Sequence, residues 1–140
     1  MKIYFAASIR GGREDSFIYS QIIDYLSDYG DVLTEHIGSP NLNKEGECHM
    51  SDLDIHDRDM KWLVSSDIII AEVTNPSLGV GYEIGRALEY GKKIICLHSK
   101  ESKSRLSAMI SGSRKIRCIK YSDIDDLKES IGIYLKKNKK

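Results

Sequence analysis

Short apolar runs recur along the 140-residue chain, separated by polar or glycine-containing segments. A run of this kind predicts a strand that is covered on both faces, as in a parallel sheet. Between the runs, apolar side chains recur every three or four residues, which predicts amphipathic helices. Five strands are therefore predicted, over residues 2–7, 31–34, 68–73, 93–97 and 116–121.

The predicted helices alternate with these strands, covering residues 16–30, 54–66, 82–91, 106–112 and 122–136. This alternation implies a single α/β domain over residues 1–140, with a doubly wound parallel sheet. We expect the flavodoxin-like, Rossmann-like strand order 2-1-3-4-5. The polar segment 35–52 is long for a loop, so it is either functional or mobile. The apolar side of the first helix is expected to consist of Phe17, Ile22, Ile23 and Leu26.

The stretch after the central strand carries candidate chemistry. Pro76 stops the strand, because proline cannot donate to a ladder, and small residues from Ser77 to Gly81 predict a loop. The backbone N–H groups of such a loop and of the following helix favour an anion. Glu83 is expected in the first turn of that helix. It either complements the helix dipole or has a functional role, and this stretch alone leaves both open.

The predicted strand order places a ligand crevice between the first and third strands, outside their carboxyl ends. Loops 8–15 and 74–81 then border one cleft, and Glu83 should face it. Ser8, Ser77 and nearby amides could hold a phosphate. Arg10 and Arg13 are either cationic donors to that phosphate or solvated loop charges.

Composition excludes several classes of protein. Hydrophobic residues make up 41% and charged residues 30%, with 21 acidic and 21 basic side chains, so no net charge attracts nucleic acid or a membrane surface. Three cysteines without C-x-x-C spacing indicate reduced thiols in a cytoplasmic protein. No apolar run approaches the roughly 20 residues of a membrane span, and no signal peptide is expected. The histidines lack metal-ligand spacing, and Asp59 by itself predicts only a solvated helix charge.

Long blocks of the chain resemble the 2′-deoxynucleoside 5′-phosphate N-hydrolases, within the nucleoside 2-deoxyribosyltransferase superfamily. The blocks are residues 4–15, 32–36, 55–63, 71–74, 76–83 and 106–110. They cover nearly the whole chain in the family's order, apart from 38–53 and the basic tail. The resemblance implies cleavage of the N-glycosidic bond of a deoxynucleoside monophosphate, without a cofactor or a metal ion. The products would be the free base and 2-deoxyribose 5-phosphate.

The resemblance also implies roles for individual residues. Glu83 matches the nucleophile, which forms a covalent deoxyribosyl ester. Asp59 matches a second carboxylate that assists proton delivery to the leaving base, and Tyr4 matches a tyrosine that orients Glu83. Ser107 matches a serine that reaches the phosphate pocket from a neighbouring subunit, so a homodimer is implied. The substrate-binding set is Ser8, Ile9, Arg10, Gly11, Ser77, Gly79, Ser107 and Met109.

Three alternatives to this function stay open. Deoxyribosyl transfer between bases needs the same nucleophile, and a hydrolase of the cytidine monophosphate type would prefer a ribonucleotide. A nucleotide-binding module without turnover belongs to a different class. The presence of both Glu83 and Asp59 argues against the module, since binding alone requires neither carboxylate.

Overall fold

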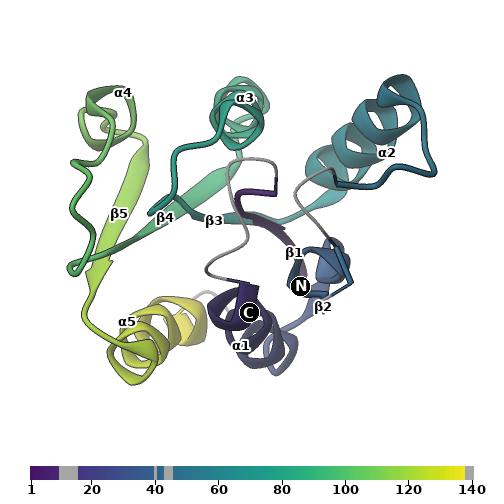
Figure 1. Cartoon of the computed structure of the whole chain (residues 1–140). Coiled ribbons are helices and arrows are strands. Elements are labelled where there is room, and N and C mark those ends of the chain that lie inside the picture. Colours follow the sequence, from purple (N-terminus) through teal and green to yellow (C-terminus); the bar gives the residue numbers. More distant parts are fainter. Residues whose placement is uncertain (10–15, 40, 43–45, 138–140) are drawn as a thin grey trace.

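A computed structural model of the chain describes residues 1–9, 16–39, 41–42 and 46–137. The fold is a five-stranded parallel sheet in the order β2-β1-β3-β4-β5, as predicted, with helices on both faces (Figure 1). The strands are β1 (Lys2–Ala6), β2 (Asp31–Val32), β3 (Ile68–Glu72), β4 (Lys93–Ser99) and β5 (Ile116–Tyr121). The helices are α1 (Ser16–Ser27), η1 (Glu35–Gly38), α2 (Asp52–Ser65), α3 (Leu78–Glu89), α4 (Ala108–Ser111) and α5 (Ile124–Lys137). The predicted residues Arg10 and Gly11 lie outside the described part.

The two faces of the sheet bury different residues, because successive side chains of a strand point to opposite sides. Ile3 and Phe5 of β1 pack into the core under α1 and α5. Tyr4 and Ala6 belong to the core on the other face, with residues of α2 and α3. Figure 1 shows α2, α3 and α4 together on this second side. The alternation therefore directs Tyr4 toward the helix that carries Glu83.

The first helix differs from the prediction in one apolar residue. Phe17 lies in the first turn of α1 and is 73% exposed. Tyr19 takes the expected place of Phe17 in the core, because its spacing to Ile22 and Leu26 matches the helical repeat. The prediction that Phe17 belongs to the apolar side was therefore wrong.

The start of α3 also differs from the prediction. The side chain of Ser77 caps the helix by accepting a hydrogen bond from the Val80 amide at 3.3 Å, so the helix begins at Leu78. Gly79 and Gly81 therefore lie inside the helix and not in the predicted loop. Glu83 lies in the second turn and not the first, where a helix-dipole role is weaker.

Candidate active site

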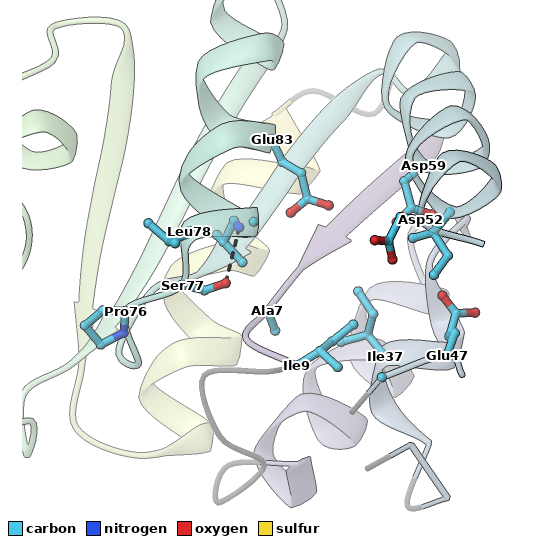
Figure 2. A pocket seen from close by; sticks show the side chains of 14 residues that line it. Ala7, Ile9, Ile37, Glu47, Asp52, Asp59, Pro76, Ser77, Leu78 and Glu83 are labelled. Carbon is cyan, nitrogen blue, oxygen red and sulfur yellow. Dashed lines mark hydrogen bonds between the residues drawn. The ribbon is translucent and has the colours of Figure 1, made fainter. Parts of the chain in front are cut away.

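A cavity of about 610 Å³ opens at the carboxyl ends of β1 and β3, where the strand order reverses. Its walls come from the chain after β1, from segment 46–52, from α2 and from the start of α3 (Figure 2). Ile9, Ile37 and Ile55 supply apolar surface, while Asp59 and Glu83 supply carboxylates. A cavity with apolar walls and a few polar groups suits a small organic ligand.

Glu83 projects from α3 into this cavity (Figure 2). The buried hydroxyl of Tyr4 donates a hydrogen bond of 2.5 Å to Glu83 Oε1. Burial raises the pKa of Glu83 to about 7, against the opposing effect of the Tyr4 hydrogen bond, and the charge of Asp59 raises it further. Burial and then the negative charge of Glu83 raise the pKa of Tyr4 far above its usual range. Tyr4 therefore keeps its proton and holds the carboxylate in one orientation.

The raised pKa of Glu83 predicts a pH-dependent cost in stability. The unfolded chain loses this proton near pH 4.5 and the folded chain near pH 7, so stability falls as pH rises through this window. Each unit of pKa difference corresponds to about 1.4 kcal/mol, so the total is about 3 kcal/mol. Glu83→Gln should therefore be more stable than wild type at pH 8, with a much smaller difference at pH 4.5.

Urea unfolding of both proteins at the two pH values measures this effect. Because other groups titrate in the same range, the informative quantity is the difference between variant and wild type. Glu89→Gln, at an exposed position on the same helix, serves as the control. A stability difference for Glu83→Gln that does not change with pH would contradict the raised pKa.

Asp59 lies on α2, on the wall of the cavity opposite α3, and its carboxylate faces the side of Glu83 (Figure 2). Burial raises the pKa of Asp59, and the hydrogen bonds and charge of Arg58 oppose this rise. The sequence by itself predicted a solvated charge at this position, and the structure instead half-buries it. A partly desolvated carboxyl group of this kind can hold a proton for a leaving group.

The start of α3 gives the cavity its anion-binding character. Ser77, Leu78 and Gly79 line the cavity at the N-terminus of a twelve-residue helix, where backbone N–H groups lack intrahelical partners. Ser8 lies two residues after the end of β1 and is fully buried, between Ala7 and Ile9, which line the cavity, while Ser8 itself does not. Among the described residues its hydroxyl has no hydrogen-bond partner. A buried hydroxyl without a partner is costly, which is consistent with a ligand that completes it.

Two predicted binding residues lie elsewhere. Ser107 and Met109 line a second cavity of about 410 Å³ between α3 and α4, which shares Ser77 and Leu78 with the first. Ser107 is exposed, and its side chain makes no capping hydrogen bond to α4. One chain therefore gathers Asp59, Glu83 and the start of α3 around the first cavity, with Tyr4 bonded to Glu83, whereas Ser107 and Met109 line only the second cavity.

Sequence reasoning missed three charged residues at the site. Glu47 and Asp52 line the cavity, and Arg58 binds both Glu47 and Asp59. The only sequence signal for Glu47 was the unusual length of the polar segment 35–52. Arg58 had no signal, because a basic residue on a polar helix is ordinarily a solvated charge.

Two carboxylates on opposite walls of one cavity are the arrangement of enzymes that cleave glycosidic bonds. Within the described residues, no group of three or more histidine, cysteine or acidic side chains could hold a metal ion. No helix in the same part of the chain is long and apolar enough to cross a membrane.

Comparisons with known proteins identify the family. The model of the nucleoside 2-deoxyribosyltransferase family matches residues 3–133. A Nematostella vectensis protein, provisionally named 2′-deoxynucleoside 5′-phosphate N-hydrolase 1, is 52% identical over 133 residues, or 90% of each chain. The 5-hydroxymethyl-dUMP N-hydrolase of Danio rerio is 47% identical, over 99% of this chain and 100% of that protein. The chain therefore belongs to the nucleoside 2-deoxyribosyltransferase family, and its resemblance to the N-hydrolases is confirmed.

A solved structure agrees on the fold. The CMP N-glycosidase of Clostridium botulinum superposes with a TM-score of 0.68, over 96% of this chain and 100% of that one. Only 20% of the aligned residues are identical, so this likeness concerns the architecture and not the substrate.

Proposed function

We propose that this chain hydrolyses the N-glycosidic bond of 2′-deoxynucleoside 5′-monophosphates to the free base and 2-deoxyribose 5-phosphate. The relatives, named as N-hydrolases, support this enzyme class. The observation that carries the proposal is the hydrogen bond from Tyr4 to Glu83, inside a cavity whose opposite wall holds Asp59. A carboxylate that is partly buried, held by a hydrogen bond and directed into the cavity is suited to act as a nucleophile.

The proposed reaction has two steps. Ionised Glu83 attacks the anomeric carbon, and the bond between this carbon and the base nitrogen breaks with its electron pair leaving on the base. Protonated Asp59 delivers its proton to the departing base, and the sugar stays on Glu83 as an ester. Water then attacks the same carbon, loses a proton to Asp59 and releases Glu83 as a carboxylate. The pKa of Glu83, about 7, implies that kcat/KM increases with pH up to this value.

The 5′-phosphate is assigned to the start of α3. Ser77 and the first N–H groups of the helix line the cavity, and the buried hydroxyl of Ser8 belongs to the residue between Ala7 and Ile9, which also line it. An anion at this place gains from both hydrogen bonds and the helix dipole. The apolar walls at Ile9, Ile37 and Ile55 then remain for the base. Cys48, Cys96 and Cys118 form no disulfide within the described residues, which supports a cytoplasmic protein.

The proposal is tested by incubating the protein with deoxynucleoside monophosphates and separating the products by chromatography. Free base and 2-deoxyribose 5-phosphate in equal amounts are the expected result. A second reaction contains a different acceptor base, since a new nucleotide would indicate deoxyribosyl transfer. Faster release from cytidine monophosphate would indicate a ribonucleotide hydrolase. Saturable binding with no released base would leave only a nucleotide-binding module.

A twofold homodimer is proposed to complete the site. Leu78 is 96% exposed and Met109 84% exposed, and both line the second cavity beside Ser107. Apolar side chains gathered around one cavity favour burial against a second copy. That copy would bring its Ser107 to the start of α3, where it could reach the phosphate.

Two variants should separate assembly from phosphate binding. Met109→Glu is expected to give a monomer by analytical sedimentation, with most activity lost, because a charge enters the apolar contact. Ser107→Ala should remain a dimer but lose about tenfold or more in kcat/KM, the equivalent of one charge-assisted hydrogen bond. Ser65→Ala, on the exposed end of α2 and away from both cavities, is the control. A fully active monomer would disprove the shared site.

A further inference from the structure

Arg58 joins two acidic groups at the edge of the cavity. Its Nε and Nη2 donate to Asp59 Oδ1 at 2.9 and 2.8 Å. Its Nη1 and Nη2 donate to the two carboxylate oxygens of Glu47 at 2.7 and 2.6 Å. The guanidinium carbon also lies over the Trp62 ring, 4.6 Å from the ring centre. The tryptophan is therefore a third contact of the guanidinium group, in addition to Asp59 and Glu47. Paired hydrogen bonds of this kind fix orientation as well as distance.

The bonds to Asp59 distinguish its two oxygens. The N–H groups on Nε and Nη2 of Arg58 both donate to Oδ1. Among the described residues, Oδ2 of Asp59 has no hydrogen bond. A cation donating twice to one oxygen makes protonation of that oxygen unfavourable. The proton of a protonated Asp59 therefore belongs on Oδ2, the oxygen that Arg58 leaves available to a ligand.

The same guanidinium holds segment 46–51 against α2. Glu47 reaches Arg58 from eleven residues away, and the Met50 sulfur lies 3.2 Å from Arg58 Nη1. Glu47 and Asp59 would face each other as like charges without Arg58 between them. The other titratable groups around Asp59 are His36, which lies 3.6 Å from Glu47, Asp52, which lines the same cavity, and Glu83 with Tyr4 across the cavity.

We propose that Arg58 is a positioning residue that keeps the proton of Asp59 on Oδ2 and makes its placement depend on Glu47. This inference rests on the proposed hydrolysis and adds to it the control of proton delivery to the base. Removal of Arg58 leaves Asp59 free to rotate and to carry its proton on either oxygen. Without the Glu47 charge, the positive charge of Arg58 is balanced by Asp59 alone. The ionised form of Asp59 is then more stable than in wild type.

The test compares two leaving groups on the same 2-deoxyribose 5-phosphate. One substrate is a deoxynucleoside monophosphate, whose base must gain a proton. The other carries 4-nitrophenol, which departs as an anion without one. Arg58→Met, which keeps the packing on Trp62 but removes every donor, should lower kcat for the nucleotide by about 10–100-fold. Its KM for the nucleotide and its kcat for the nitrophenyl substrate should stay within about threefold of wild type.

The pH profile gives a second and independent readout. The alkaline limb of kcat reports loss of the proton that the interacting pair Asp59 and Glu83 holds for delivery to the base. The limb should move to higher pH in Arg58→Met, because the variant lacks the cation beside Asp59. It should move to lower pH in Glu47→Gln, because Arg58 then has no second carboxylate and Asp59 lacks a neighbouring negative charge. Arg58→Lys should restore the position of the limb but not kcat, because a single ammonium cannot reproduce the paired bonds.

Arg86→Gln is the matched control, because Arg86 bonds Tyr82, Tyr90 and Glu89 on the surface of α3 and lines neither cavity. Its kcat and pH profile should equal those of wild type. Equal losses of Arg58→Met on both substrates, or limbs that move the same way in Arg58→Met and Glu47→Gln, would overturn the role of Arg58. A wild-type protein that releases neither leaving group would instead refute the proposed function.

Discussion

Replacing Glu83 with alanine is expected to lower kcat for base release by several orders of magnitude while leaving the fold intact. The loss follows because the variant has no group to form the covalent intermediate and must rely on direct attack by water. The fold should survive because the carboxylate projects into the cavity (Figure 2) and its ionised form is destabilised by burial. Steady-state release of base measures the first effect, and thermal unfolding measures the second.

The same experiment can reveal the intermediate. Rapid acid quenching of wild type with substrate, followed by digestion and mass spectrometry, should find 2-deoxyribose 5-phosphate attached to the peptide containing Glu83. Glu89→Ala, on the exposed end of the same helix, should retain full activity. Tyr4→Phe should lie between the two, because Glu83 keeps its reactivity but loses the bond that orients it. Activity of Glu83→Ala within tenfold of wild type would exclude Glu83 as the nucleophile.

Removing the 5′-phosphate from the substrate should have the second-largest effect, a loss of a few orders of magnitude in kcat/KM. Hydrogen bonds from hydroxyl and amide donors to a charged group contribute roughly 1.5–3 kcal/mol each. Several such bonds at Ser8, Ser77 and the start of α3 account for the expected loss, at about tenfold per 1.4 kcal/mol. Because binding energy from this remote group can act at the reacting carbon, kcat should fall as well as affinity.

The comparison uses three compounds that carry one common base. The expected order of kcat/KM is the deoxynucleoside monophosphate, then the ribonucleoside monophosphate, then the unphosphorylated deoxynucleoside. The ribonucleotide is slower because a 2′-hydroxyl withdraws electrons from the cation-like transition state and crowds Glu83. Ser77→Ala should reduce the preference for the phosphate, with a stability loss of about 1 kcal/mol from the helix cap. Equal kcat/KM for the unphosphorylated deoxynucleoside would favour a deoxyribosyltransferase instead.

The sequence by itself determined the architecture of this protein. Apolar runs and helical spacing are local properties, and in a doubly wound sheet they imply both the alternation of elements and the strand order. The strand order in turn determined where the cavity lies. The blocks around Tyr4, Asp59 and Glu83 determined the family, because their residues and order are specific. Errors in the bounds of the elements were local, as where capping by Ser77 started α3 four residues before the predicted Tyr82.

Only the tertiary structure decided the electrostatics of the site. The pKa of Glu83 depends on burial between β1 and α3 and on a tyrosine 79 positions away, and no spacing rule connects the two. The contact between Glu47 and Arg58 likewise requires segment 46–51 to fold back onto α2. A charged side chain in a polar segment has the same local pattern whether it is solvated or paired. Its role is therefore decided by the groups that the fold brings within hydrogen-bonding distance, as Arg58 shows beside Asp59.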